Sequence, residues 1–83
     1  MDREVEINKI VEITEGSLPV EFIVLAMQII NNKYKVKEYK EYAELISKEF
    51  NCICTVNDIY DASSYSLAYT DYVLARKNLG FWD

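Results

Sequence analysis

Residues 40–62 constrain the fold of this chain most, because their apolar residues recur at helical spacing on both sides of a short turn. The first stretch predicts a helix from Lys37 to Phe50, and Asn51 is a suitable end because asparagine tolerates the left-handed backbone conformation. Thr55 then begins a second helix, with Asp58 three residues later in the arrangement of a capping box. The apolar residues expected to pack inward are Tyr39, Tyr42, Ala43, Ile46 and Phe50 on the first helix, and Val56, Ile59 and Tyr60 on the second. We expect the second helix to end or bend at residues 62–64.

The segment 2–15 fits two secondary structures. Ile7, Ile10 and Val11 share one face of a helix, whereas Val5 with Ile7 and Val11 with Ile13 alternate as in a strand. The glutamate content and the stop signal at Gly16 favour the helix. A short N-terminal strand remains the alternative.

A further helix is predicted to start near Ser17 and to run to Asn31–Asn32. Ser17 can cap free backbone N–H groups, Pro19 suits the first turn, and Glu21 meets the positive end of the helix dipole. This helix is apolar on two sides, which is typical of a helix at the centre of its domain. The polar residues 31–36 are expected to connect it to the next helix.

The last helix is expected from Tyr65 to Leu79. Arg76 and Lys77 lie in its final turn, where cations suit the negative end of the dipole, and Gly80 closes it. Phe81 and Trp82 would fold back over the core. Since the 83 residues include only two glycines and one proline, we predict one all-α domain over 1–83, a compact bundle of four to five helices.

Composition restricts the function. The chain carries a net charge of −5, its longest apolar run is far shorter than a membrane span, and no basic region precedes an apolar run as in a secretory signal. We therefore expect a cytoplasmic protein with no membrane partner, or one inside a phage particle, since the bias towards Ile, Asn, Lys and Tyr is typical of phage and low-GC bacterial proteins.

Constellations for catalysis or metal binding are missing. The chain has no histidine, which removes Ser-His and Cys-His nucleophiles, and Cys52 and Cys54 alone supply too few ligands for zinc. The chain has just two glycines, at positions 16 and 80, so it cannot form a glycine-rich loop that binds phosphate. We expect no enzymatic activity, no cofactor and no metal, with both cysteines buried as structural residues.

Residues 37–63 resemble the helix-turn-helix domains of small bacterial and phage regulators. The resemblance rests on Ala43, the turn at 51–54, the Thr55 cap and Ile59, while the glycine usual in that turn is missing. It implies that the second helix enters the DNA major groove, where Asn57 could read adenine. Asp58 and Asp61 on the same helix would face phosphates at an energetic cost. Phosphate contacts would come from Lys33, Lys35, Lys37, Lys40 and Lys48.

Two functions remain, and we favour a non-enzymatic protein-protein interaction module, an accessory or structural subunit that binds a protein partner or itself. The acidic charge favours it, and so do the seven tyrosines, which exceed what so small a core can bury. Tyr42, Tyr60 and Tyr72 suit the core. The expected interface residues are Tyr34, Tyr65, Tyr69, Phe81 and Trp82. The alternative is a helix-turn-helix transcriptional regulator that binds DNA.

Overall fold

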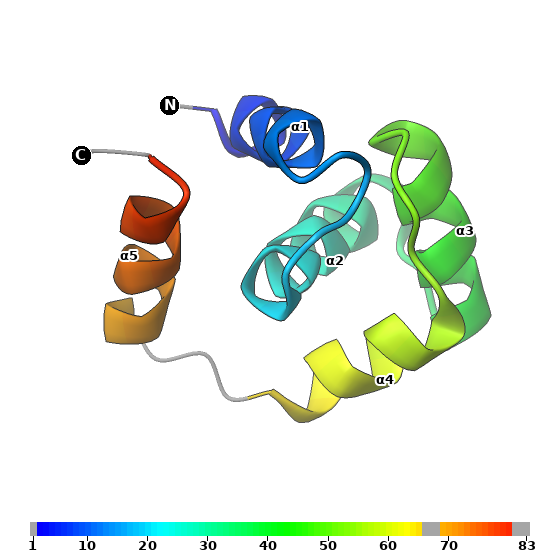
Figure 1. Cartoon of the computed structure of the whole chain (residues 1–83). Helices are drawn as coiled ribbons and strands as arrows, with labels where there is room; N and C mark the ends of the chain where they lie inside the picture. Colours follow the sequence, from blue (N-terminus) through cyan, green and yellow to red (C-terminus); the bar gives the residue numbers. More distant parts are fainter. Residues whose placement is uncertain (1, 66–68, 81–83) are drawn as a thin grey trace.

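Five helices and no strand make up the described part of the chain, residues 2–65 and 69–80, in a computed structural model (Figure 1). The helices are α1 (Arg3–Ile13), α2 (Val20–Tyr34), α3 (Tyr39–Glu49), α4 (Val56–Ser64) and α5 (Tyr69–Asn78). The predicted all-α bundle is confirmed, and the ambiguous N-terminal segment is a helix. None of the described helices has both the length and the apolar character that crossing a bilayer requires.

Helix α1 is held by local signals at both ends. The Asp2 side chain accepts a hydrogen bond of 2.8 Å from the backbone N–H of Glu4, which satisfies one of the donors that a helix start leaves open. At the other end the chain turns through two left-handed residues, Glu15 and Gly16. The Gly16 carbonyl then accepts a 2.7 Å bond from the N–H of Ile53, which ties the α1–α2 connection to the α3–α4 connection.

Helix α2 is the centre of the bundle and packs against α1, α3 and α4, as its two apolar sides predicted. Its boundaries differ from the expected ones. Pro19 is the N-cap in place of Ser17, and its carbonyl accepts the N–H groups of Phe22 and Ile23. The helix also continues beyond Asn32 to Tyr34 and ends where Lys35 adopts a left-handed conformation.

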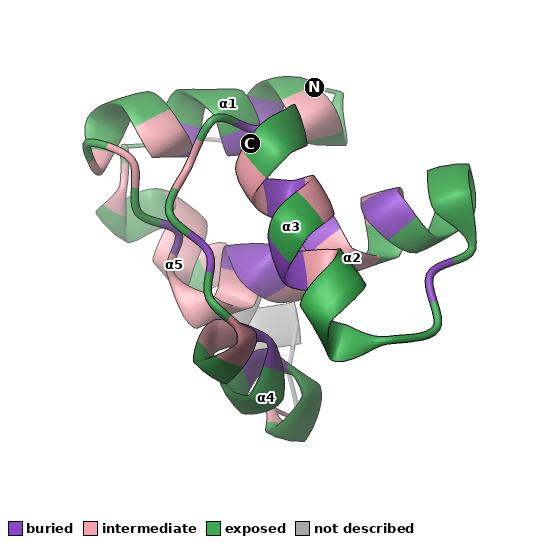
Figure 2. Ribbon diagram, turned by 90° about the vertical axis from the view of Figure 1, so that its right-hand side faces the viewer, coloured by how far each residue is buried: buried purple, intermediate pink, exposed green. Residues whose placement is uncertain are grey.

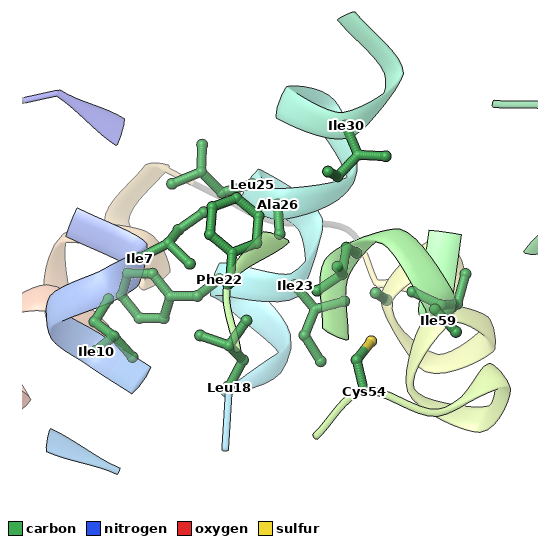
Figure 3. Packing of buried hydrophobic residues seen from close by; sticks show 14 of the residues in the cluster. Ile7, Ile10, Leu18, Phe22, Ile23, Leu25, Ala26, Ile30, Cys54 and Ile59 are labelled. Atoms are coloured by element: carbon green, nitrogen blue, oxygen red, sulfur yellow. The ribbon is translucent and has the colours of Figure 1, made fainter. Parts of the chain in front are cut away.

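The core lies on both sides of α2. Ile7 and Ile10 meet Phe22 on the α1 side, whereas Ile23 lies towards Cys54 and Ile59 on the α3–α4 side (Figure 3). The largest fully buried side chains are Ile7, Ile10, Phe22, Ile30, Ile46 and Ile59.

Helices α3 and α4 pack against each other and are joined by residues 50–55. Helix α3 begins at Tyr39 and not at Lys37, while Asn51 has the expected left-handed conformation, with φ of 50°. The predicted capping box at the start of α4 is present, with Thr55 and Asp58 bonded reciprocally. The helix-turn-helix resemblance itself stays a prediction.

Helix α5 begins at Tyr69, not at Tyr65, because Tyr65 ends α4 as its C-cap in an extended conformation. Ala75 and Leu79 pack against the core. The Nε of Arg76 lies 2.7 Å from the Oε1 of Glu6, and the two side chains are only 14% and 5% exposed. This ion pair joins α5 to α1.

Candidate functional site

The expected interface tyrosines do not form one surface within the described residues. Tyr34 is 49% exposed at the end of α2, and its hydroxyl donates to the Glu49 carboxylate on α3, which raises the pKa of Tyr34. Tyr65 is half-buried, with its hydroxyl 3.4 Å from Oε1 of Glu21 near the start of α2. The two tyrosines therefore lie at opposite ends of α2. The other expected interface residues, the side chain of Tyr69 and the residues Phe81 and Trp82, lie outside the described part.

The expected lysines are all exposed, but they fall into separate groups. The Nζ of Lys33 lies 2.6 Å from the Glu4 carboxylate on α1, which raises the pKa of the ammonium. Lys35 and Lys37 flank Val36, which is buried, and they line a hollow with Asn31 and Asn32.

Lys40 and Lys48 lie two turns apart on α3 and line a shallow groove of about 620 Å³ between α3 and the start of α4. Its apolar floor includes Ala43 and Cys54, both buried, and the half-buried Val56. The groove residues are Lys40, Ala43, Glu44, Ser47, Lys48, Cys54, Thr55 and Val56.

Ser47 shapes this groove by holding the α3–α4 connection against α3. Its Oγ donates to the Cys54 carbonyl at 3.0 Å and accepts the Cys54 N–H at 3.2 Å. A single hydroxyl thus satisfies both backbone polar groups of a buried residue, as burial demands. Thr55 and the start of α4 are consequently set beside the middle of α3.

Tyr39 and Tyr60 form an exposed aromatic pair, with Tyr39 directly before the groove residue Lys40 and Tyr60 one helical turn after the groove residue Val56. Their ring centroids are 4.9 Å apart with an interplanar angle of 78°, the favourable edge-to-face arrangement, and the residues are 38% and 54% exposed. The expectation that Tyr60 belongs to the core is therefore wrong, as is the inward placement of Tyr39. A signal was available: Asn57, Tyr60, Asp61 and Ser64 recur at helical spacing, so Tyr60 falls on a polar stripe. In Figure 2 the exposed colour alternates with the buried colour along α3 and α4, as expected for helices with one face in the core.

The outer face of α4 carries no cation. Lys and Arg do not occur between Val56 and Ser64, and the exposed residues include Asn57 and Asp61. The Asp58 carboxylate accepts the Thr55 N–H at 2.9 Å and the Thr55 hydroxyl at 3.1 Å. Of the backbone donors at the start of α4, the Thr55 N–H is therefore bonded to a carboxylate of the chain and the Asp58 N–H to the Thr55 hydroxyl.

The cysteines are poorly suited to nucleophilic chemistry. Burial, together with the negative charge of Asp58, raises the pKa of Cys54 to about 12, and burial also raises the pKa of the half-buried Cys52. Because the thiolate is the reactive form, both side chains stay protonated near neutral pH. Within the described residues, no group of three or more potential ligands is placed to hold a metal ion.

No family model, no curated protein and no solved structure matches this chain.

Proposed function

We propose that this protein is a non-enzymatic protein-interaction module, an accessory or structural subunit of the cytoplasm or of a phage particle. Its contact surface is the α3–α4 surface, which we define as Tyr39, Tyr60 and the adjoining groove. The exposed Tyr39–Tyr60 pair carries the proposal. Tyrosine is enriched at binding hot spots because its rigid ring buries a large apolar area while its hydroxyl keeps a polar partner.

The charge of α4 supports a protein partner over DNA. A helix that enters the major groove approaches phosphates closely, and its affinity depends on Lys and Arg that neutralise them. Helix α4 has neither residue and exposes Asp61 beside Tyr60. A protein partner does not require Lys or Arg on α4, because a protein surface offers apolar area for contact and hydrogen-bond donors for the carboxylates of α4.

The test compares two kinds of tyrosine substitution. A partner captured from the native host by the immobilised protein is purified, and its affinity is measured by calorimetry for the wild type, for Tyr39→Ser/Tyr60→Ser and for Tyr34→Ser. Tyr34 is the matched control, since it is an exposed tyrosine outside the α3–α4 surface. We expect the double variant to lose at least about tenfold in affinity, the effect of one hot-spot residue, and the control to keep the wild-type affinity. Unchanged affinity in the double variant would reject the proposed surface.

A DNA-binding regulator is the second candidate, supported by the exposure of Lys35, Lys37, Lys40 and Lys48. Fluorescence anisotropy with a labelled duplex tests it. DNA binding through these lysines would weaken by about 0.9 unit of log affinity per unit of log salt for each phosphate contact. Saturable, sequence-selective binding near physiological salt that Lys40→Glu/Lys48→Glu abolishes would establish this function in place of the first.

A further inference from the structure

We propose that the α3–α4 groove binds an acidic segment of a partner protein, with an apolar side chain seated on the groove floor and two carboxylates paired with Lys40 and Lys48. This inference rests on the proposed function and specifies the chemistry of the partner.

The floor of the groove selects an apolar side chain. Ala43 and Cys54 are buried and Val56 is half-buried, so the exposed part of the floor consists largely of carbon and sulfur atoms. Burial of Cys54 raises its pKa and keeps the thiol neutral, and a buried neutral thiol behaves as a small apolar group. A Leu or Met side chain from a partner would remove this surface from water.

The rim of the groove selects carboxylates. Lys40 and Lys48 are exposed, and neither forms an ion pair within 4.0 Å among the described residues, although Glu44 stands one turn from each. The groove lining holds two lysines and one glutamate, and the Asp58 carboxylate, which is bonded to Thr55, adds a second negative charge next to it. The attraction for a negatively charged segment is therefore local to the two ammonium groups, while the chain as a whole, with a net charge of −5, repels such a segment.

The spacing of the two lysines sets the pattern of the segment. Eight residues along a helix correspond to about 12 Å, which an extended chain covers in about four residues. Side chains at alternate positions of an extended chain point to the same side. The matching segment therefore has an acidic residue, an apolar residue two positions later and a second acidic residue two positions after that.

Nucleic acid fits the groove less well. Asp58 accepts the Thr55 N–H at the start of α4 and so places a negative charge where a phosphate would approach this helix start, and Asp61 adds a second negative charge on the same helix. A continuous phosphate backbone would meet these aspartates, whereas two carboxylates at a fixed spacing need only the two lysines.

Synthetic peptides provide the test, with the full-length chain as the receptor. The first probe carries Asp-Ser-Leu-Ser-Glu between Gly-Ser flanks, the second has the same residues rearranged so that the two acids are adjacent, and the third replaces both acids with Lys. Titrations are followed by amide chemical shifts. We expect saturable shifts of Ala43, Ser47 and Thr55 with the first peptide, weaker binding of the second and none of the third.

Substitutions identify the contacts. We expect Lys40→Gln and Lys48→Gln each to weaken binding of the first peptide about two- to fivefold, the effect of an exposed ion pair, while Lys9→Gln on α1 leaves it unchanged. Equal binding of all three peptides, shifts confined to other helices, or no saturable shift with the first peptide would overturn the inference. Displacement of the peptide by duplex DNA at physiological salt would do the same and favour the regulator.

The two proposals fail in different ways. If the captured partner loses affinity with Tyr39→Ser/Tyr60→Ser but not with Lys40→Gln/Lys48→Gln, the surface is correct and the acidic chemistry is wrong. If neither pair of substitutions changes its affinity, the surface itself is wrong.

Discussion

Replacing Arg76 with Met tests the connection between the two ends of the fold. The guanidinium lies 2.7 Å from the Glu6 carboxylate, and the side chains are 14% and 5% exposed, so the substitution leaves a nearly buried carboxylate without this cation. Removing one partner of a buried ion pair costs about 3–5 kcal/mol. Because Arg76 retains some contact with water, we expect the low end, about 3 kcal/mol. That is a large share of the free energy of unfolding, which is about 5–15 kcal/mol for a typical native protein.

The assay is urea unfolding followed by circular dichroism, with the double variant Glu6→Leu/Arg76→Met as the comparison. The double variant has no charge left to bury, so it should be more stable than Arg76→Met alone, since apolar replacement of a buried pair is often neutral. Native-state hydrogen exchange should also show faster exchange of the amides of α5 in Arg76→Met. If Arg76→Met unfolds within about 0.5 kcal/mol of the wild type, as ordinary surface substitutions do, the ion pair does not hold α5 in place.

Three further outcomes are expected. Ile59→Ala, at a fully buried position, should lower the free energy of unfolding by about 2–5 kcal/mol in urea titrations, and an unchanged midpoint would contradict its place in the core. Thr55→Ala removes the capping box of α4 and should cost about 1 kcal/mol, measured in the same way, with Thr55→Ser as the control that keeps the hydroxyl. Burial raises the pKa of Cys54 from 9.0 to about 12, so the folded state holds a proton that the unfolded state releases. The stability due to this thiol is therefore complete below pH 9 and is lost as the pH rises towards 12. As the pH rises through this range, the free energy of unfolding should fall further for the wild type than for Cys54→Ala. If the two proteins give parallel curves of unfolding free energy against pH, the raised pKa of Cys54 is contradicted.

The sequence by itself determined the local structure well. Thr55 with Asp58, and Asn51 in its left-handed conformation, depend on backbone groups within a few residues, so their chemistry can be read directly from the chain. The periodicity of Ala43, Ile46 and Ile59 likewise predicted core positions, because one helix turn sets which side chains share a face. Ser17 shows the limit of such signals: propensity ranks serine above proline as an N-cap, yet Pro19 takes the cap position of α2.

Only the tertiary structure decided which surfaces meet. Glu6 and Arg76 are separated by 70 positions, and no local pattern couples them, because their contact depends on how α5 lies against α1. The pairing of Tyr39 with Tyr60 has the same origin: the polar stripe of α4 indicates that Tyr60 is exposed, but only the packing of α4 against α3 brings the two rings together. The groove likewise exists because Ser47 holds Cys54 against α3 and brings the start of α4 beside Lys40. Helix formation depends on neighbours in sequence, whereas the candidate site depends on the docking of helices, which the buried side chains determine jointly.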